Sequence, residues 1–226
     1  MSLSEVHERL IACRRCPRLV EWRERVGREK RAAFRDEDYW AKPVPGFGDP
    51  RARAVVVGLA PAAHGANRTG RMFTGDRSGD WLFRSLYRTG FANQSTSEHA
   101  DDGLELTGMF VTSAVHCVPP GNAPTAAERA ACLDWTVEEL RTLPTPAVVV
   151  ALGQVGYDAV LRMADAMGWE RPTPKPKFGH GVEMTLGGGP LLICSFHPSQ
   201  QNTFTRRLTE EMLDAVFERV VEFVSG

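Results

Sequence analysis

The chain has 226 residues, of which 42% are hydrophobic and 24% are charged. These ordinary fractions predict one globular domain over residues 1–226, long enough to bury a full core without a second domain. The net charge of −1 gives no global argument for a nucleic-acid partner, and no apolar run is as long as a signal peptide or a membrane span, so we expect a soluble cytoplasmic protein that does not bind membranes.

Two helices are predicted before residue 35. Ser2 and Glu5 have the spacing of a capping box, and apolar residues follow at helical spacing, which predicts a short helix that runs into Cys13. A basic amphipathic helix is predicted over 18–30, and a connector without clear periodicity over 34–50. The basic residues here have two interpretations, solvated helix faces or a footprint that contacts phosphates.

The rest of the chain alternates predicted strands with predicted helices. Each predicted strand is a short apolar run that ends at Gly, Pro or polar residues, and these runs cover 54–57, 109–115, 147–152 and 191–195. Helices are expected over 78–88, from 125 to about 143, over 154–167 and from about 205 to 224. This alternation predicts an α/β fold, a mainly parallel sheet with helices on both faces.

The loop after the first predicted strand, from Leu59 to Asp76, is the candidate active-site loop. It is rich in Gly, Ala and Asn, so its backbone N–H groups can approach a ligand closely. Loops at the carboxyl ends of strands line the ligand crevice of an open α/β sheet. Phe73 is interpreted as a core residue or as a stacking surface, and Asp76 as a helix cap or as a group that holds a water against the substrate.

Two polar residues follow other strand ends. Asn122 comes after the second strand, where a turn residue is the first interpretation. His197 comes after the fourth strand. A lone histidine is commonly solvated or satisfied by a neighbour, but at a strand end it can donate a hydrogen bond to charge that develops on a leaving group.

Four of the five cysteines have the spacing of a ligand set. Cys13 and Cys16 form a C-x2-C motif, and Cys117 and Cys132 are a second pair farther along the chain. A disulfide framework is not expected in a reducing compartment, and four thiolates suit either a tetrahedral zinc or an iron–sulfur cluster. Buried cysteines without a ligand are the alternative. Cys194 lies within an apolar strand and is predicted to be a core residue.

Three features together carry a resemblance to a known family: the segment GLAPAAHGANRTGRMFTGD, the segment SFHPSQQN and the four-cysteine pattern. With them the chain resembles the uracil-DNA glycosylase superfamily, most closely its iron–sulfur family 5 branch. The resemblance covers nearly the whole chain. It implies a single domain with a four-stranded parallel sheet between helices, and an N-terminal segment, about 1–35, that helps to bind a structural [4Fe-4S] cluster on Cys13, Cys16, Cys117 and Cys132.

The resemblance also implies roles for residues. The backbone of Gly58, Ala60, Pro61 and Ala62 would hold the base, Phe73 would stack on it, and His197 would donate a hydrogen bond to the uracil O2. Ser199, Gln200 and Gln201 would form a wedge that enters the duplex beside the extruded nucleotide, and the cost of flipping is offset by such contacts. The further DNA contacts that the resemblance implies are Asn202 and Arg206.

Two departures from the family pattern change the expected chemistry. No acid or amide stands in GLAPA, so the task of handling the water is assigned to Asp76 with Asn122 assisting, unless a dissociative mechanism needs little base help. Ser113 stands where related branches place an asparagine that reads the uracil edge. A short hydroxyl reads a base less exclusively, which predicts that hypoxanthine, ethenocytosine and 5-hydroxymethyluracil are substrates besides uracil.

The function implied by the resemblance is base-excision repair. A monofunctional glycosylase would flip uracil out of DNA and hydrolyse the N-glycosidic bond, leaving an abasic site, as a monomer associated with the nucleoid when it is on DNA. A second hypothesis is a module that traps uracil-containing DNA without turnover. A third is a zinc-stabilised α/β domain with an unrelated nucleotide ligand.

Overall fold

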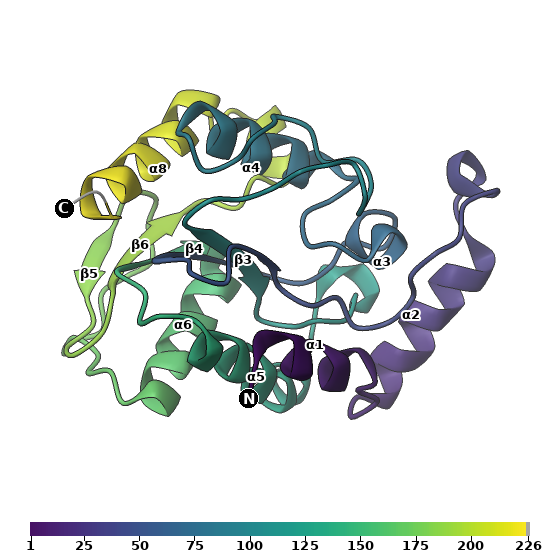
Figure 1. Cartoon of the computed structure of the whole chain (residues 1–226), viewed down its shortest axis with the longest axis horizontal. Helices are drawn as coiled ribbons and strands as arrows, with labels where there is room; N and C mark the ends of the chain where they lie inside the picture. The colour runs from purple at the N-terminus through teal and green to yellow at the C-terminus, as the bar shows by residue number, and fades with distance from the viewer. Residues whose placement is uncertain (225–226) are drawn as a thin grey trace.

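The computed structural model describes residues 1–224, which form one mixed sheet with helices on both faces (Figure 1). Within these residues the sheet has six strands, in the order β1-β3-β2-β4-β6-β5. The strands are β1 (Phe47–Gly48), β2 (Ala54–Gly58), β3 (Met109–Ser113), β4 (Val148–Leu152), β5 (Glu183–Thr185) and β6 (Leu191–Ser195). The helices are α1 (Leu3–Ile11), α2 (Pro17–Glu29), α3 (Ala66–Thr69), α4 (Arg77–Arg88), α5 (Ala126–Thr142), α6 (Gly153–Met167), α7 (Gln200–Phe204) and α8 (Glu210–Val224), with 3₁₀ turns η1 (Ala32–Phe34) and η2 (Pro120–Asn122).

The four central strands are parallel, as predicted. Strand β2 pairs with β3 on one side and with β4 on the other, and β4 pairs with β6. Every residue of these strands is buried, which explains why their sequences have no polar face. The prediction of four strands missed β1 and β5, which pair antiparallel at the two edges. With two and three residues, these strands are too short to show a periodicity.

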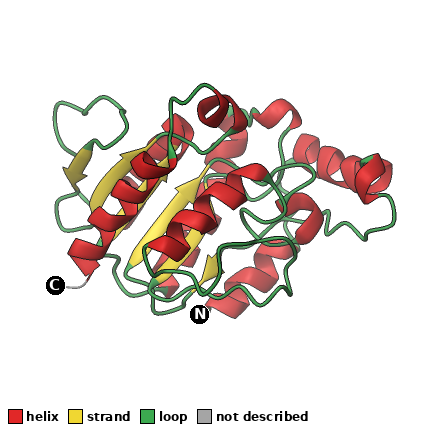
Figure 2. Ribbon diagram, turned by 90° about the horizontal axis from the view of Figure 1, so that it is seen from above, coloured by secondary structure: helices red, strands yellow, loops and turns green. Residues whose placement is uncertain are grey.

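Alternate residues of the central strands face two separate layers of helices. Val56, Val150 and Ile193 belong to a core that includes residues of α4 and α8, whereas Val55 and Val149 belong to a core with α5 and α6. Figure 1 shows α4 and α8 on one side of the sheet and α5 and α6 on the other. Figure 2 shows the helices lying along the strands, seen from above. The sheet is therefore covered on both faces, and ligand access is left to its ends.

Two helices begin with the capping boxes that the sequence predicts. The hydroxyl of Ser2 accepts a hydrogen bond from the Glu5 N–H, and the Glu5 carboxylate accepts one from the Ser2 N–H. Thr125 and Glu128 make the same pair of bonds at the start of α5. Each cap pairs backbone N–H groups that have no partner within the helix.

The last predicted helix was wrong in its first part. The segment after β6 forms the short helix α7, and α8 begins only at Glu210. Ser199 caps α7, because its hydroxyl accepts a hydrogen bond from the Asn202 N–H. Soon after the end of α7 the chain turns at Arg206, whose φ of 55° is left-handed. A left-handed residue cannot continue a right-handed helix, so the two helices are separate.

Helices α1 and α2 form a small layer of their own. Val6 and Leu10 of α1 and Leu19 of α2 pack with Trp135 of α5 in a third apolar cluster, next to the main core. Figure 1 shows α1 beside α5, while α2 extends away from the sheet. Among the helices of residues 1–224, none is long and apolar enough to cross a membrane.

We predict that Gly156→Ala destabilises the fold. A Cβ atom at this position of α6 would lie 2.5 Å from the backbone oxygen of Val57, so the helix would have to move away from β2. Overpacking of this kind costs about 1–3 kcal/mol of the free energy of unfolding. Urea denaturation measures the effect, with Gln154→Ala, an exposed change on the same helix, as the control. Equal stability of the two variants would contradict the close contact.

Candidate active site

A cavity of about 600 Å³ lies at the carboxyl ends of β2 and β6. Both strands pair with β4 and run in the same direction, so the loops that follow them meet at one edge of the sheet. The cavity is lined by Leu59, Ala60, Pro61, Ala62, Met72, Phe73, Asp76, Arg77, Ser78, Asn122, His197, Ser199, Gln200 and Gln201. Segments that lie far apart in the sequence are thus brought to one place.

Phe73 and His197 form one wall of this cavity. Their ring centroids are 6.1 Å apart and their planes differ by 30°, so the two rings are stacked. Gly58 at the end of β2 permits this arrangement, because a Cβ atom there would lie 2.6 Å from Cζ of Phe73. Phe73 itself has a left-handed φ of 53°. Such a conformation is unfavourable for a bulky residue and is typically held at functional sites.

Asp76 caps α4 and also lines the cavity. Its Oδ1 accepts hydrogen bonds from the N–H groups of Ser78 at 2.8 Å and Gly79 at 3.0 Å. Its Oδ2 lies against Gly65, where a Cβ atom would be only 2.3 Å away. Burial raises the pKa of the Asp76 carboxyl, and the two N–H groups partly oppose this effect. The cap is therefore present, and it occupies only one of the two carboxylate oxygens.

Contacts to its backbone position His197, and its imidazole remains neutral near pH 7. The side-chain amide of Asn202 donates a hydrogen bond to the His197 carbonyl at 2.8 Å. Gly153, with a left-handed φ of 79°, lies so close that a Cβ atom there would be 3.1 Å from the His197 Cβ. Burial lowers the pKa of His197 to about 4. A neutral imidazole carries one N–H, which can donate to a ligand in the cavity.

The other predicted DNA-contacting and assisting residues surround the cavity mouth. Asn122 is exposed in η2 with a left-handed φ of 56°, which asparagine tolerates. Gln200 and Gln201 are exposed on α7 and line the cavity together with Ser199, the cap of that helix. Asn202 acts on the His197 backbone and, like the exposed Arg206, is not part of the lining.

Ser113 lies behind the cavity wall. It is 1% exposed, and its hydroxyl donates a hydrogen bond to the Val115 carbonyl at 2.9 Å. The sulfur of Met72, a lining residue, is 3.6 Å from the Ser113 hydroxyl. The role of Ser113 in reading a base stays a prediction. The sequence analysis did not select Met72, Arg77 and Ser78 as site residues, although they flank Phe73 and Asp76 in the sequence.

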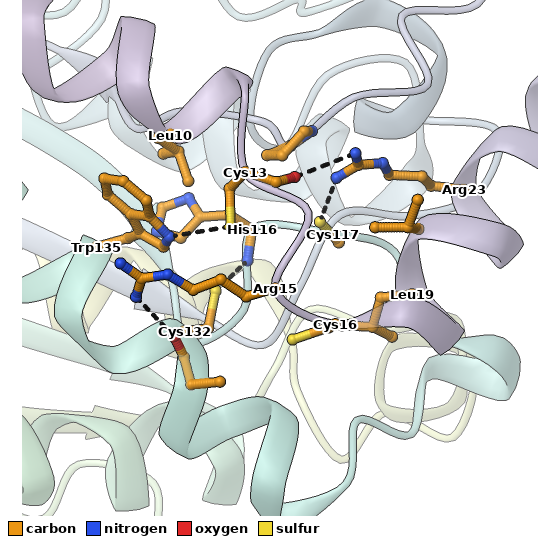
Figure 3. A pocket seen from close by; sticks show the side chains of 13 residues that line it. Leu10, Cys13, Arg15, Cys16, Leu19, Arg23, His116, Cys117, Cys132 and Trp135 are labelled. Atoms are coloured by element: carbon orange, nitrogen blue, oxygen red, sulfur yellow. Dashed lines mark hydrogen bonds between the residues drawn. The ribbon is translucent and has the colours of Figure 1, made fainter.

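The four cysteines of the predicted ligand set line a second, much smaller hollow (Figure 3). Cys13 and Cys16 come from the turn between α1 and α2, Cys117 follows β3, and Cys132 lies on α5. Burial raises the pKa of the Cys117 thiol to about 11, and it also raises the pKa of the Cys132 thiol. Thiols in such surroundings ionise only when positive charge is supplied.

Several N–H groups point at these sulfur atoms. The Arg23 guanidinium donates to Sγ of Cys117 at 3.0 Å, and the Trp135 indole donates to Sγ of Cys13 at 3.3 Å. The backbone N–H of His116 donates to Sγ of Cys132 at 3.3 Å. Hydrogen bonds of this kind stabilise thiolate ligands and tune bound metals.

The surroundings of Arg23 indicate whether an anionic group fits this hollow. Its side chain is 2% exposed, its Nε has no hydrogen-bond partner, and within residues 1–224 no carboxylate pairs with it. A buried guanidinium without a counter-charge is costly. An anionic cluster held by thiolates would supply that charge, so the residues fit such a group. In the described part of the chain, no three His, Cys, Asp or Glu side chains are arranged to hold a single metal ion.

The cysteine hollow is connected to the active-site loop. Ala60, which lines the cavity, also packs against the apolar cluster that contains Cys117 and Cys132. Arg18 of α2 donates hydrogen bonds to the Ala123 carbonyl and to the Glu128 carboxylate, next to η2. Cys194, by contrast, is fully buried in β6, which confirms it as a core residue.

Comparison with known proteins identifies the family. The family model of the uracil DNA glycosylase superfamily matches residues 45–221, a range that contains both strand-end loops of the cavity. The chain belongs to the uracil DNA glycosylase superfamily. This confirms the resemblance inferred from the motifs, and the α/β fold agrees with it.

Relatives within the superfamily are similar along nearly the whole chain. The type-5 uracil-DNA glycosylase of Mycobacterium tuberculosis is 52% identical over 217 residues, which cover 96% of this chain and 80% of the relative. The type-5 uracil-DNA glycosylase of Thermus thermophilus is 52% identical over 203 residues, 90% of each chain. That of Pyrobaculum aerophilum is 44% identical over 229 residues, 97% of this chain and 96% of the relative. This uracil DNA glycosylase superfamily member is thus similar to type-5 relatives over 90 to 97% of its length.

We predict that His197 titrates near pH 4 and that this depresses stability in acid. Its folded pKa lies below the value of 6.5 for a free histidine, so folding favours the neutral ring. The associated stability is fully present above the unfolded pKa and is lost as the pH falls from 6.5 toward 4. NMR of the imidazole measures the pKa. His197→Asn should remove this part of the pH dependence of unfolding, and a ring that titrates near 6.5 would contradict the prediction.

Proposed function

We propose that this chain is a uracil-DNA glycosylase of base-excision repair, which hydrolyses the N-glycosidic bond of uracil in DNA and leaves an abasic site. The observation that carries the proposal is the cavity wall in which the Phe73 ring stacks beside a neutral His197, in a cavity that the first residues after β2 also line. The type-5 relatives bear the same activity in their names. We further propose that the protein acts as a monomer in the cytoplasm, on nucleoid DNA.

The base is bound by stacking and by backbone groups. Phe73 offers the face of an aromatic ring to a flipped uracil, and the backbone of the GLAPA segment, from Gly58 to Ala62, borders the same space. An extruded base loses its stacking in the duplex, at a cost of a few kcal/mol, and recovers part of it against an aromatic side chain. The wedge formed by Ser199, Gln200 and Gln201, with Asn202 and Arg206 behind it, holds the duplex open.

His197 stabilises the departing base. When the bond between N1 and C1′ breaks, its electron pair stays with the uracil, and negative charge develops on O2. The N–H of a neutral imidazole can donate a hydrogen bond to that oxygen, and the protonation state of the ring does not have to change. Because burial keeps the ring neutral and fixed, the donor needs no reorganisation during the reaction. The Asn202 amide positions His197 through its carbonyl.

Asp76 acts on the water that completes the reaction. The sugar left behind has oxocarbenium character at C1′, and a water oxygen adds to that carbon while its proton passes to the carboxylate. The raised pKa of Asp76 makes it a stronger base than an exposed aspartate. One of its oxygens is engaged by the helix N-terminus and the other remains for the water. Asn122, across the cavity mouth, assists in holding that water.

The proposed substrate range extends beyond uracil. The Ser113 hydroxyl donates to a backbone carbonyl and supplies no amide that would read the uracil edge. Hypoxanthine, ethenocytosine and 5-hydroxymethyluracil are therefore included among the proposed substrates.

We also propose that Cys13, Cys16, Cys117 and Cys132 hold a [4Fe-4S] cluster. Four thiols around one hollow and the unpaired Arg23 charge support this assignment. When bound, such a cluster crosslinks α1, α2, α5 and the segment after β3, and it takes no part in the hydrolysis. Arg23 supplies its counter-charge and Trp135 a hydrogen bond to a ligand sulfur.

The catalytic roles predict distinct effects of matched substitutions. Asp76→Asn keeps an oxygen for the helix cap but removes the base, so it should lower kcat by about 10²-fold or more with little change in thermal stability. Asp76→Ala removes the helix cap as well as the base, so it should lower both kcat and thermal stability. His197→Ala should lower kcat by a similar factor. The assay follows alkali-induced cleavage of a labelled duplex with uracil opposite guanine.

The same assay decides between hydrolysis and trapping. Multiple turnovers by the parent protein support the glycosylase. Full activity of Asp76→Asn would reduce Asp76 to a helix cap and reject the proposed base. Retention of the labelled strand without turnover would identify a module that traps uracil-containing DNA.

The cluster assignment predicts about four iron atoms per chain in anaerobically purified protein, with the visible absorbance of an iron–sulfur centre. Cys13→Ser should lose this iron, whereas Cys194→Ala, in the core of β6, should retain it. Arg23→Met should lose iron to a chelator faster than the parent, because the buried counter-charge is gone. A colourless protein with stoichiometric zinc would reject the cluster in favour of a zinc site.

A further inference from the structure

An exposed aromatic side chain lies beside the cavity without a role in the proposed reaction. Phe204, the last residue of α7, is 66% exposed, more than any other large aromatic residue in the described part of the chain. Gln200 and Gln201 of the same short helix line the cavity. A single exposed phenylalanine is common on protein surfaces, but this one belongs to the helix that borders the cavity, where its ring is available to a flat ligand.

Arg77 links Phe204 to the cavity. It is exposed at the start of α4 and lines the cavity, and its guanidinium carbon lies 4.3 Å from the centroid of the Phe204 ring. Among residues 1–224 no carboxylate lies within 4.0 Å of this guanidinium. Burial raises the pKa of the nearby Asp80, and the charge of Arg77 is one of the groups that oppose this. The positive charge of Arg77 therefore acts on the Asp80 carboxyl, but no ion pair neutralises it.

Two more arginines follow Phe204 in the sequence, after Thr205. Arg206 and Arg207 are both exposed, and in the described residues neither forms an ion pair with an acidic side chain. Arg207 lies over the Phe196 ring, with 4.5 Å between its guanidinium carbon and the ring centroid. The acidic residue that comes next in the chain, Glu210, pairs with Arg88 instead. Phe204 thus has Arg77 against its ring and two further arginines close by in the sequence, although the whole chain has a net charge of −1.

A similar pair elsewhere in the molecule lacks this free charge. Phe223 at the end of α8 is 38% exposed, and the Arg219 guanidinium lies 4.5 Å from its ring centroid. Arg219 is neutralised by ion pairs with Glu183 and Glu222. The next residue, Val224, accepts a hydrogen bond from Arg53 just before β2, which places this pair near the amino ends of the strands. The pair of Phe223 and Arg219 is therefore a control for the pair of Phe204 and Arg77.

We propose that Phe204 and Arg77 form a second DNA subsite beside the cavity. An unpaired base that flanks the extruded nucleotide stacks on the Phe204 ring, and a neighbouring phosphate pairs with Arg77, while Arg206 and Arg207 extend the contact along the backbone. Stacking on an aromatic ring tolerates any base, and an unpaired guanidinium attracts phosphate. The inference rests on the proposed glycosylase function, because it places the extruded nucleotide in the adjacent cavity.

Such a subsite has a consequence for substrate choice. A base can stack on Phe204 only when it has left its partner, so the subsite favours DNA that is already unpaired at the lesion. We expect tighter binding to single strands and to mismatched duplexes than to fully paired duplexes, and this preference should depend on Phe204.

Binding to a product analogue tests the subsite without catalysis. The probe is an oligonucleotide with a tetrahydrofuran abasic analogue and the fluorescent base 2-aminopurine beside it. The parent should quench the 2-aminopurine. Phe204→Ala and Phe204→Leu should abolish the quenching and weaken binding by about fivefold or more, whereas Phe204→Tyr should restore both. Phe223→Ala should match the parent.

The salt dependence of DNA binding tests the role of the Arg77 charge. Arg77→Gln should lower the slope of log Kd against log salt by about 0.7 to 0.9, the value of one phosphate contact. An unchanged slope would contradict the proposed contact between Arg77 and a phosphate. Circular dichroism of each variant checks that the fold is intact, which is expected because both side chains are exposed.

Failure of this inference is distinguishable from failure of the proposed function. If Phe204→Ala excises uracil and quenches 2-aminopurine like the parent, the subsite is rejected and the glycosylase stands. If the parent does not release uracil, the glycosylase is rejected, and the inference, which places its nucleotide by that activity, falls with it.

Discussion

The parallel pairing of β2, β4 and β6 is the constraint on which the site depends. Because β2 and β6 flank β4 and run in the same direction, the loop after Gly58 and the loop after Ser195 open at the same edge of the sheet. The buried apolar strands hold this edge rigid, with about 25 cal/mol of stabilisation for each Å² of apolar surface removed from water. The stacking of Phe73 on His197 follows from that geometry.

The two functional regions handle buried charge in opposite ways. In the cavity, burial lowers the pKa of His197 and keeps its ring neutral, so the ring carries one N–H and no charge. In the cysteine hollow, the buried cation of Arg23 is kept without a carboxylate, which suits a group that brings negative charge of its own. In both places the low polarity of the surroundings strengthens whatever electrostatic interaction a ligand completes.

The cysteine hollow and the cavity are mechanically connected. Ala60 contacts both, and the segment between Cys117 and Cys132 carries Asn122. The α2 residue Arg18 fastens the end of that segment through Ala123 and Glu128. A group that crosslinked the cysteines would therefore restrict two segments that line the cavity.

Local sequence determined most of the elements and the composition of the two sites. The apolar runs, the capping boxes of Ser2 and Thr125 and the motifs around Phe73, His197 and the cysteines predicted the central sheet, the helix starts and the residues that gather, because these depend on neighbours along the chain. Only the tertiary structure decided the edge strands β1 and β5, the break at Arg206, the place of Ser113 behind Met72, the neutral state of His197 and the burial of Arg23. These depend on contacts between distant segments and on the loss of solvent, which no local pattern records.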